Sequence, residues 1–99
     1  MKGTIYLIRL DNNKMRIGFT NNVKRTLREF SGKVIVSQVF LEGATMAHKT
    51  ALRCRYRKFK IEGNDWFEWR EEIEEEFKRF TLHDLDSLVL GEKIGREDL

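Results

Sequence analysis

The sequence has few of the residues that stabilise a small protein through cross-links or metal clusters. It contains one cysteine, Cys54, which excludes an intramolecular disulfide. With that cysteine and two histidines, His48 and His83, it has too few ligands for a zinc cluster of the usual composition. It contains no proline, which is compatible with short loops between regular elements.

Long hydrophobic runs are also missing. The first apolar run, residues 5–8, is far shorter than a membrane span, which needs about 20 residues, or the core of a signal peptide. We therefore expect a cytoplasmic protein that does not span a membrane. The 99 residues suffice for one hydrophobic core, and the 40% of apolar residues indicates a globular domain rather than a disordered chain.

Charge is divided unevenly along the chain, although the net charge is only +3. Fourteen Lys and Arg against three Asp and Glu give residues 1–60 a charge of +11. Five against thirteen give residues 61–99 a charge of −8. This division predicts a surface that binds a polyanion, an acidic surface that binds a protein, or both.

Two strands are predicted at the start of the chain, residues 3–10 and 14–20, joined by three residues that favour turns, 11–13. In the register that a three-residue loop gives, Tyr6 pairs with Gly18. One face of the hairpin then collects only apolar side chains, namely Ile5, Leu7, Met15, Ile17 and Phe19. A two-residue loop would scatter these side chains over both faces, so we favour the three-residue loop.

The remaining pattern predicts a helix, a third strand over residues 33–41, a second helix over 45–59, and an acidic helix over 70–80 followed by a short helix and a tail. The expected fold class is α+β: a small three-stranded antiparallel sheet flanked by helices, a ββαβα core, with an additional acidic C-terminal helix. We assign residues 1–69 to this core and residues 70–99 to a helical extension packed on the same domain.

Four basic residues fall at helical spacing on the predicted second helix. They are Lys49, Arg53, Arg57 and Lys60, at i, i+4, i+8 and i+11. Such a row can follow a phosphate backbone and release its counterions, which gives salt-dependent and largely sequence-independent binding. Further cations add to the basic excess: Arg9, Arg16, Lys24, Arg25 and Arg28. The alternative is a solvated helix face, or a face that pairs with the glutamates of the acidic helix.

The order of short motifs along the chain is recognisable. Gly3-Thr4-Ile5-Tyr6 is followed by Arg16-Ile17-Gly18, a helix that contains Arg25, a strand, a second helix, and Asp65-Trp66-Phe67. This order resembles the GIY-YIG nuclease superfamily, in particular its compact branch in phage and bacterial proteins, and the resemblance covers residues 3–69. It implies phosphodiester cleavage assisted by Mg²⁺ or Mn²⁺, with a tyrosine from the first motif, a basic or tyrosine residue from the second, an arginine and a metal-binding glutamate.

Two of the implied catalytic positions are present. Tyr6 matches the first-motif tyrosine, and Arg16 lies on the same face of the hairpin in the favoured register. A cation at this place would lower the pKa of the tyrosine and let it activate a water molecule. The alternative is a half-buried aromatic side chain with a surface arginine over it.

The other two positions depart from the family pattern. The position expected to hold the arginine is Thr26, with Arg25 next to it. The metal-binding glutamate is expected early in the second helix, where the chain has His48 and Lys49. An ammonium group repels Mg²⁺, which prefers oxygen ligands. A substitute carboxylate would have to come from Glu42, Glu62, Asp65 or Glu68.

The sequence therefore predicts a nucleic-acid-binding protein, for DNA rather than RNA, with impaired nuclease activity and no bound metal, of the kind that acts as a phage regulator or inhibitor. The predicted binding residues are Arg16, Lys24, Arg25, Arg28, Lys49, Arg53, Arg57 and Lys60. One alternative is an active metal-dependent endonuclease that cleaves DNA through Tyr6, Arg16 and Arg25. Another is a regulator that binds a protein through the acidic helix, Glu71–Glu76.

Overall fold

The fold of the chain is given by a computed structural model that describes residues 2–63 and 65–91. The predicted tail, residues 92–99, lies outside the described residues. The strands of the described part are β1 (Gly3–Leu10), β2 (Lys14–Thr20), β3 (Ile35–Ala44), β4 (Lys60–Glu62) and β5 (Trp66–Glu68). Its helices are α1 (Val23–Arg28), α2 (Met46–Arg55), the 3₁₀ helix η1 (Arg57–Phe59), α3 (Glu71–Arg79) and α4 (Leu82–Val89). The predicted α+β class is confirmed.

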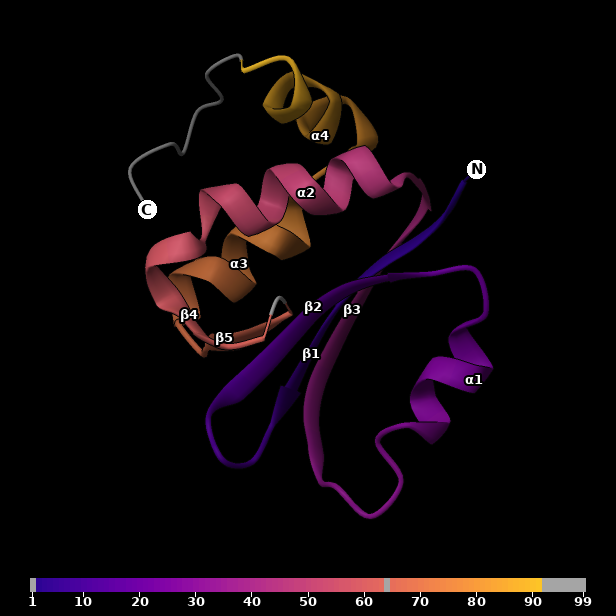
Figure 1. The fold of residues 1–99 in the computed structure, drawn as a ribbon, viewed down its shortest axis with the longest axis vertical. Coiled ribbons are helices and arrows are strands. Elements are labelled where there is room, and N and C mark those ends of the chain that lie inside the picture. The colour runs from indigo at the N-terminus through magenta and orange to yellow at the C-terminus, as the bar shows by residue number, and fades with distance from the viewer. Residues whose placement is uncertain (1, 64, 92–99) are drawn as a thin grey trace.

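The strands form one antiparallel sheet in the order β3-β1-β2-β5-β4 (Figure 1). The prediction of three strands is wrong, because β4 and β5 form a second hairpin that extends the sheet beyond β2. Each has three residues, too few to give a clear alternating pattern in the sequence. Strand β3 ends at Ala44 rather than at residue 41, because it pairs with β1 back to Gly3.

The register of the first hairpin is the one predicted from the sequence. Tyr6 lies opposite Gly18, and Ile8 lies opposite Arg16. In the loop, Asn13 has a φ of 62°, a left-handed conformation that asparagine tolerates. The predicted apolar face is buried: Ile5, Leu7, Met15 and Ile17 are 0% exposed, and Phe19 packs against them.

The helices cover both faces of the sheet (Figure 1). On one face lie α2, α3 and α4, whose side chains Leu52, Phe77 and Leu85 join the main core. On the other face lie α1 and the loop after it, where Phe30 packs against Tyr6 in a second cluster. The acidic extension therefore shares the core of the domain, and the basic residues of α1 and α2 lie on opposite sides of the sheet.

The second helix is shorter than the predicted range of residues 45–59. Thr45 caps α2, and the helix ends before Tyr56, whose backbone leaves the helical conformation. The chain continues as η1 and then enters β4. Arg57 and Lys60 therefore do not continue the helical spacing of the basic residues on α2.

Some glutamates of α3 are structural. Glu76 is 2% exposed and accepts two hydrogen bonds of 2.7 Å from the Arg55 guanidinium and one of 2.6 Å from the Tyr56 hydroxyl. Glu74 is 7% exposed and is also hydrogen-bonded. These bonds join the basic and acidic halves of the chain inside the protein. The exposed acidic residues of the range predicted to bind a protein are Glu71, Glu72 and Glu75.

We expect Glu76→Gln to lower the free energy of unfolding by about 3 kcal/mol, because it removes the buried carboxylate charge to which Arg55 and Tyr56 are hydrogen-bonded. The matched control is Glu75→Gln on the same helix, whose side chain is 49% exposed. The control should change stability by less than about 0.5 kcal/mol. Urea denaturation measures both values, and equal effects of the two substitutions would contradict the buried network.

Candidate nucleic-acid interface

The tyrosine of the first motif and the glycine of the second motif form one packing unit. Tyr6 is 2% exposed and lies over Gly18 on the neighbouring strand. A Cβ atom at position 18 would lie 2.5 Å from Tyr6 Cζ, so a larger residue would displace the ring. The glycine thus fixes the position of the phenol on the α1 face of the sheet.

Arg16 lies between two carboxylates. Its Nη1 is 3.1 Å from Glu29 Oε1, at the end of α1, and its Nη2 is 4.0 Å from Asp65 Oδ2, just before β5. The guanidinium also lies 5.6 Å and 5.9 Å from the ring centroids of Phe30 and Trp66. Arg16 is therefore a largely compensated cation rather than a free one.

Asp65 also pairs with the residue that stands at the expected metal-binding position. The ammonium of Lys49 reaches from α2 to within 3.0 Å of Asp65 Oδ1, and its side chain is only 14% exposed. This oxygen is buried and makes no hydrogen bond, so the contact is an ion pair. Lys49 and Arg16 thus meet on one carboxylate, from α2 and from β2.

The surroundings raise the pKa of the Tyr6 phenol. Burial has the largest effect, the charge of Arg16 opposes it, and the carboxylates of Asp65 and Glu29 reinforce it. Arg16 acts in the direction expected from the sequence, but the expectation that it would lower the pKa overall is wrong. The phenol stays protonated at neutral pH and is poorly suited to deprotonate a water molecule.

Arg25 lies with Tyr6 and Arg16 around one pocket of about 230 Å³, which we call the Tyr6 pocket. Its guanidinium contacts Asn21 Oδ1 at 3.4 Å. The neighbouring Thr26 is 5% exposed and donates a hydrogen bond of 2.8 Å to the Thr20 hydroxyl. The threonine at the expected arginine position therefore supports the base of α1, while Arg25 reaches the pocket from the next position.

The predicted row of four cations on the second helix is divided. Lys49 is paired with Asp65, whereas the other three line a separate hollow of about 210 Å³, which we call the α2 hollow. Its lining residues are Thr50, Arg53, Cys54, Arg57, Lys60 and Phe67. Two further predicted binding residues, Lys24 and Arg28, are exposed on α1.

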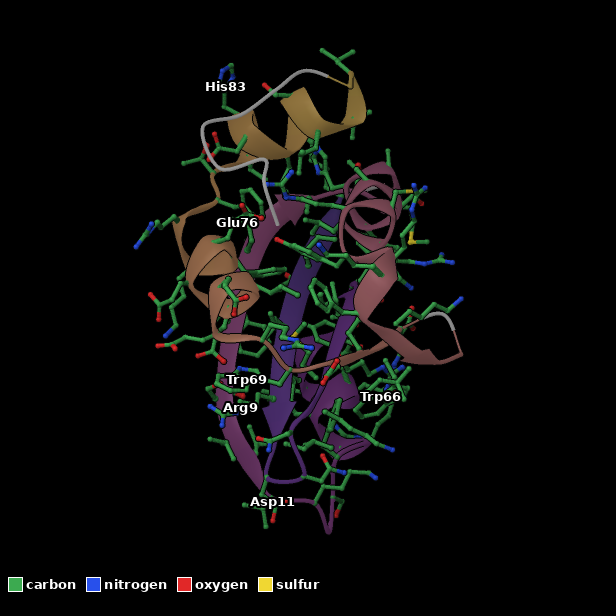
Figure 2. The ribbon with its side chains drawn as sticks, turned by 90° about the vertical axis from the view of Figure 1, so that its left-hand side faces the viewer. Arg9, Asp11, Trp66, Trp69, Glu76 and His83 are labelled. Atoms are coloured by element: carbon green, nitrogen blue, oxygen red, sulfur yellow. The ribbon has the colours of Figure 1, made fainter. Side chains whose placement is uncertain are left out.

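Arg9, which also contributes to the basic excess, stacks on an aromatic ring. Its guanidinium carbon lies 3.7 Å from the centroid of a ring of Trp69, and the two side chains lie side by side in Figure 2. The indole nitrogen of Trp69 donates a hydrogen bond of 3.0 Å to Glu74. This tryptophan therefore belongs to the packing between β1 and α3.

The carboxylates near the Tyr6 pocket do not fit a metal site. Glu29 and Asp65 are both paired with cations, and Glu68 pairs with Arg70 at 3.0 Å. Within residues 2–63 and 65–91, no group of three His, Cys, Asp or Glu side chains is placed to hold a metal ion. The side chain of Glu62 is not among those described.

The sequence did not predict that Glu29 pairs with Arg16. Nothing in a helical or strand pattern links it to Arg16, thirteen positions earlier. The one feature of the sequence that could have indicated a role for Glu29 is its position: it is the one acidic residue between Asp11 and Glu42, inside the basic part of the chain.

Comparison with known proteins gives no relative for this chain: no family model, curated protein or solved structure matches it. Among the helices that the structure describes, none has the length and apolar character needed to cross a membrane.

We expect Tyr6 to titrate above the value of about 10 that is usual for tyrosine. The chain has two tyrosines, so Tyr56→Phe leaves Tyr6 as the only phenol. Adding Arg16→Gln should raise its pKa further, because the substitution removes the nearest cation. The ultraviolet absorbance of the phenolate as a function of pH measures both values. A midpoint below 10, or a downward shift on loss of Arg16, would contradict this electrostatic description.

Proposed function

We propose that this protein binds the phosphate backbone of a nucleic acid on a GIY-YIG-like domain and does not cleave it. The observation that carries the proposal is the ion pair between Lys49 and Asp65, at 3.0 Å. In the motif resemblance, Lys49 stands where a metal-binding glutamate is expected. A cation fixed at this place repels a divalent ion and also neutralises the nearest carboxylate.

Binding to a polyanion is supported by the surplus of cations on the surface. The Tyr6 pocket holds Arg25 and Arg16, and the α2 hollow holds three further basic side chains. Arginine donates several hydrogen bonds in a planar fork that matches phosphate oxygens. A surface of this kind binds nucleic acid mainly through counterion release, with little dependence on sequence.

The absence of cleavage is supported by the state of Tyr6. Burial raises the pKa of its phenol, so little phenolate is available to act as a general base. Without a metal ion, the remaining stabilisers of a phosphoryl transition state are guanidinium groups, and Arg16 is already paired with Glu29.

A metal-dependent endonuclease is the second candidate function, and one observation favours it. Asp65 lies beside Arg16 and was among the carboxylates that the sequence offered as a substitute ligand. A metal would have to displace Lys49 from it. A regulator that binds proteins through the acidic helix is less favoured, because Glu74 and Glu76 make hydrogen bonds inside the protein.

Fluorescence anisotropy with labelled duplex DNA, single-stranded DNA and RNA of one sequence tests the proposal. We expect binding at low salt to DNA, with duplex affinity falling linearly on a double-logarithmic plot by about 0.9 per phosphate contact. A preference for RNA would contradict the predicted preference for DNA but not the proposed binding through backbone phosphates. Absence of binding to all three, or affinity independent of salt, would contradict the proposal.

Incubation of plasmid with the purified protein and Mg²⁺ or Mn²⁺ separates the two candidate functions. We expect the plasmid to remain supercoiled under conditions in which anisotropy shows saturation. Nicking that disappears in Tyr6→Phe and in Asp65→Asn would establish the endonuclease instead. Nicking that persists in both variants would indicate a contaminating nuclease.

A further inference from the structure

The α2 hollow differs from the Tyr6 pocket in how its cations are compensated. In the Tyr6 pocket, Arg16 is paired with Glu29 at 3.1 Å and Asp65 lies at 4.0 Å. In the α2 hollow, Arg53, Arg57 and Lys60 make no ion pair or hydrogen bond with any described side chain. Three positive charges around one depression therefore lack a counter-charge from the described protein.

The backbone that carries these cations is held rigidly. Arg55 and Tyr56, which lie between Arg53 and Arg57 in the sequence, are both hydrogen-bonded to the buried carboxylate of Glu76. This contact fixes the point at which α2 ends and η1 begins. The orientation of Arg57 relative to Arg53 is thus set by the core before any ligand arrives.

The floor of the hollow belongs to the sheet. Phe67 is 0% exposed and is paired with Met15 on one side and with Lys60 on the other. Lys60 is therefore tied by strand pairing to the residue beneath the hollow. Binding of an anion therefore has to order the side chains of these cations but not the backbone that carries them.

We propose that the α2 hollow is the principal phosphate-binding subsite of the protein, and that it takes phosphodiester groups of a nucleic-acid backbone through Arg53, Arg57 and Lys60. The inference rests on the proposed function. It places the strongest phosphate contacts on the face of the sheet opposite α1, away from Tyr6. The Tyr6 pocket contributes less, because a phosphate there competes with Glu29 for Arg16, and Arg25 is then its one cation without an ion pair to a described carboxylate.

The single cysteine of the chain allows a direct test. Cys54 is exposed and lines the α2 hollow. A methanethiosulfonate reagent with a sulfonate group adds a negative charge there, and one with a trimethylammonium group of similar size adds a positive charge. We expect the sulfonate to weaken DNA binding by at least about tenfold at low salt, whereas the trimethylammonium group leaves affinity unchanged or increases it.

Cys54→Ala is the control, because without the thiol neither reagent can react, so its own affinity for DNA should not change on treatment. Equal weakening by both reagents, or no effect of either, would overturn the inference.

A matched pair of double variants gives an independent measurement. Arg53→Gln with Arg57→Gln removes two charges from the α2 hollow, and Lys24→Gln with Arg28→Gln removes two from exposed positions on α1. We expect the first pair to reduce the slope of the salt dependence by about two and the second pair to reduce it less. Equal slopes for the two variants would also overturn the inference.

The outcomes distinguish this inference from the function on which it rests. If the unmodified protein binds neither DNA nor RNA, the proposed function fails. Titration with inorganic phosphate, followed by the amide NMR signals of residues 53–60, then tests the subsite alone. Signals that shift only around Tyr6 would place the anion site elsewhere. If DNA binds and only the α1 variant weakens it, the function stands and the proposed subsite is wrong.

Discussion

Asp65 connects β2 with α2 through its side chain, which lies near Arg16 and pairs with Lys49. Its backbone carbonyl accepts a hydrogen bond of 3.0 Å from Ile17, which ties it to β2. Its side chain lies near Arg16 on the face covered by α1 and pairs with Lys49 from α2, on the other face. Because backbone and side chain are both held, the carboxylate is fixed beside the Tyr6 pocket and already has its charge balanced.

The balance of charge separates what the two depressions can do. Beside the Tyr6 pocket, cations and carboxylates alternate from Lys49 through Asp65 to Arg16, which also pairs with Glu29 of the pocket lining. This series of pairs balances the charge of Arg16 and, among the described residues, leaves no ligand set for a metal. Arg25 is the cation of the Tyr6 pocket that forms no ion pair with a described carboxylate. The α2 hollow has cations without described carboxylate partners. Under the proposed function, this arrangement would direct a polyanion to the face that carries α2.

The sequence predicted the elements whose signal is local and periodic. Alternation over the hairpin gave its register, and the cap at Thr45 gave the start of α2. It did not give β4 and β5, because three-residue strands form through pairing with Met15 rather than through their own pattern. The pairing of Lys49 with Asp65 and of Arg16 with Glu29 depends on tertiary distance, which spacing along the chain does not encode. Burial of Tyr6 likewise reversed the expected direction of its pKa shift.

The central claim is that Lys49, rather than a divalent ion, occupies the place beside Asp65. Electron paramagnetic resonance of free Mn²⁺ during titration with protein tests it most directly. We predict that the wild-type protein leaves the signal of free Mn²⁺ unchanged, and that Lys49→Glu reduces it, because that substitution replaces the ammonium beside Asp65 with a second carboxylate. Binding of Mn²⁺ by the wild-type protein that is lost in Asp65→Asn would contradict the claim.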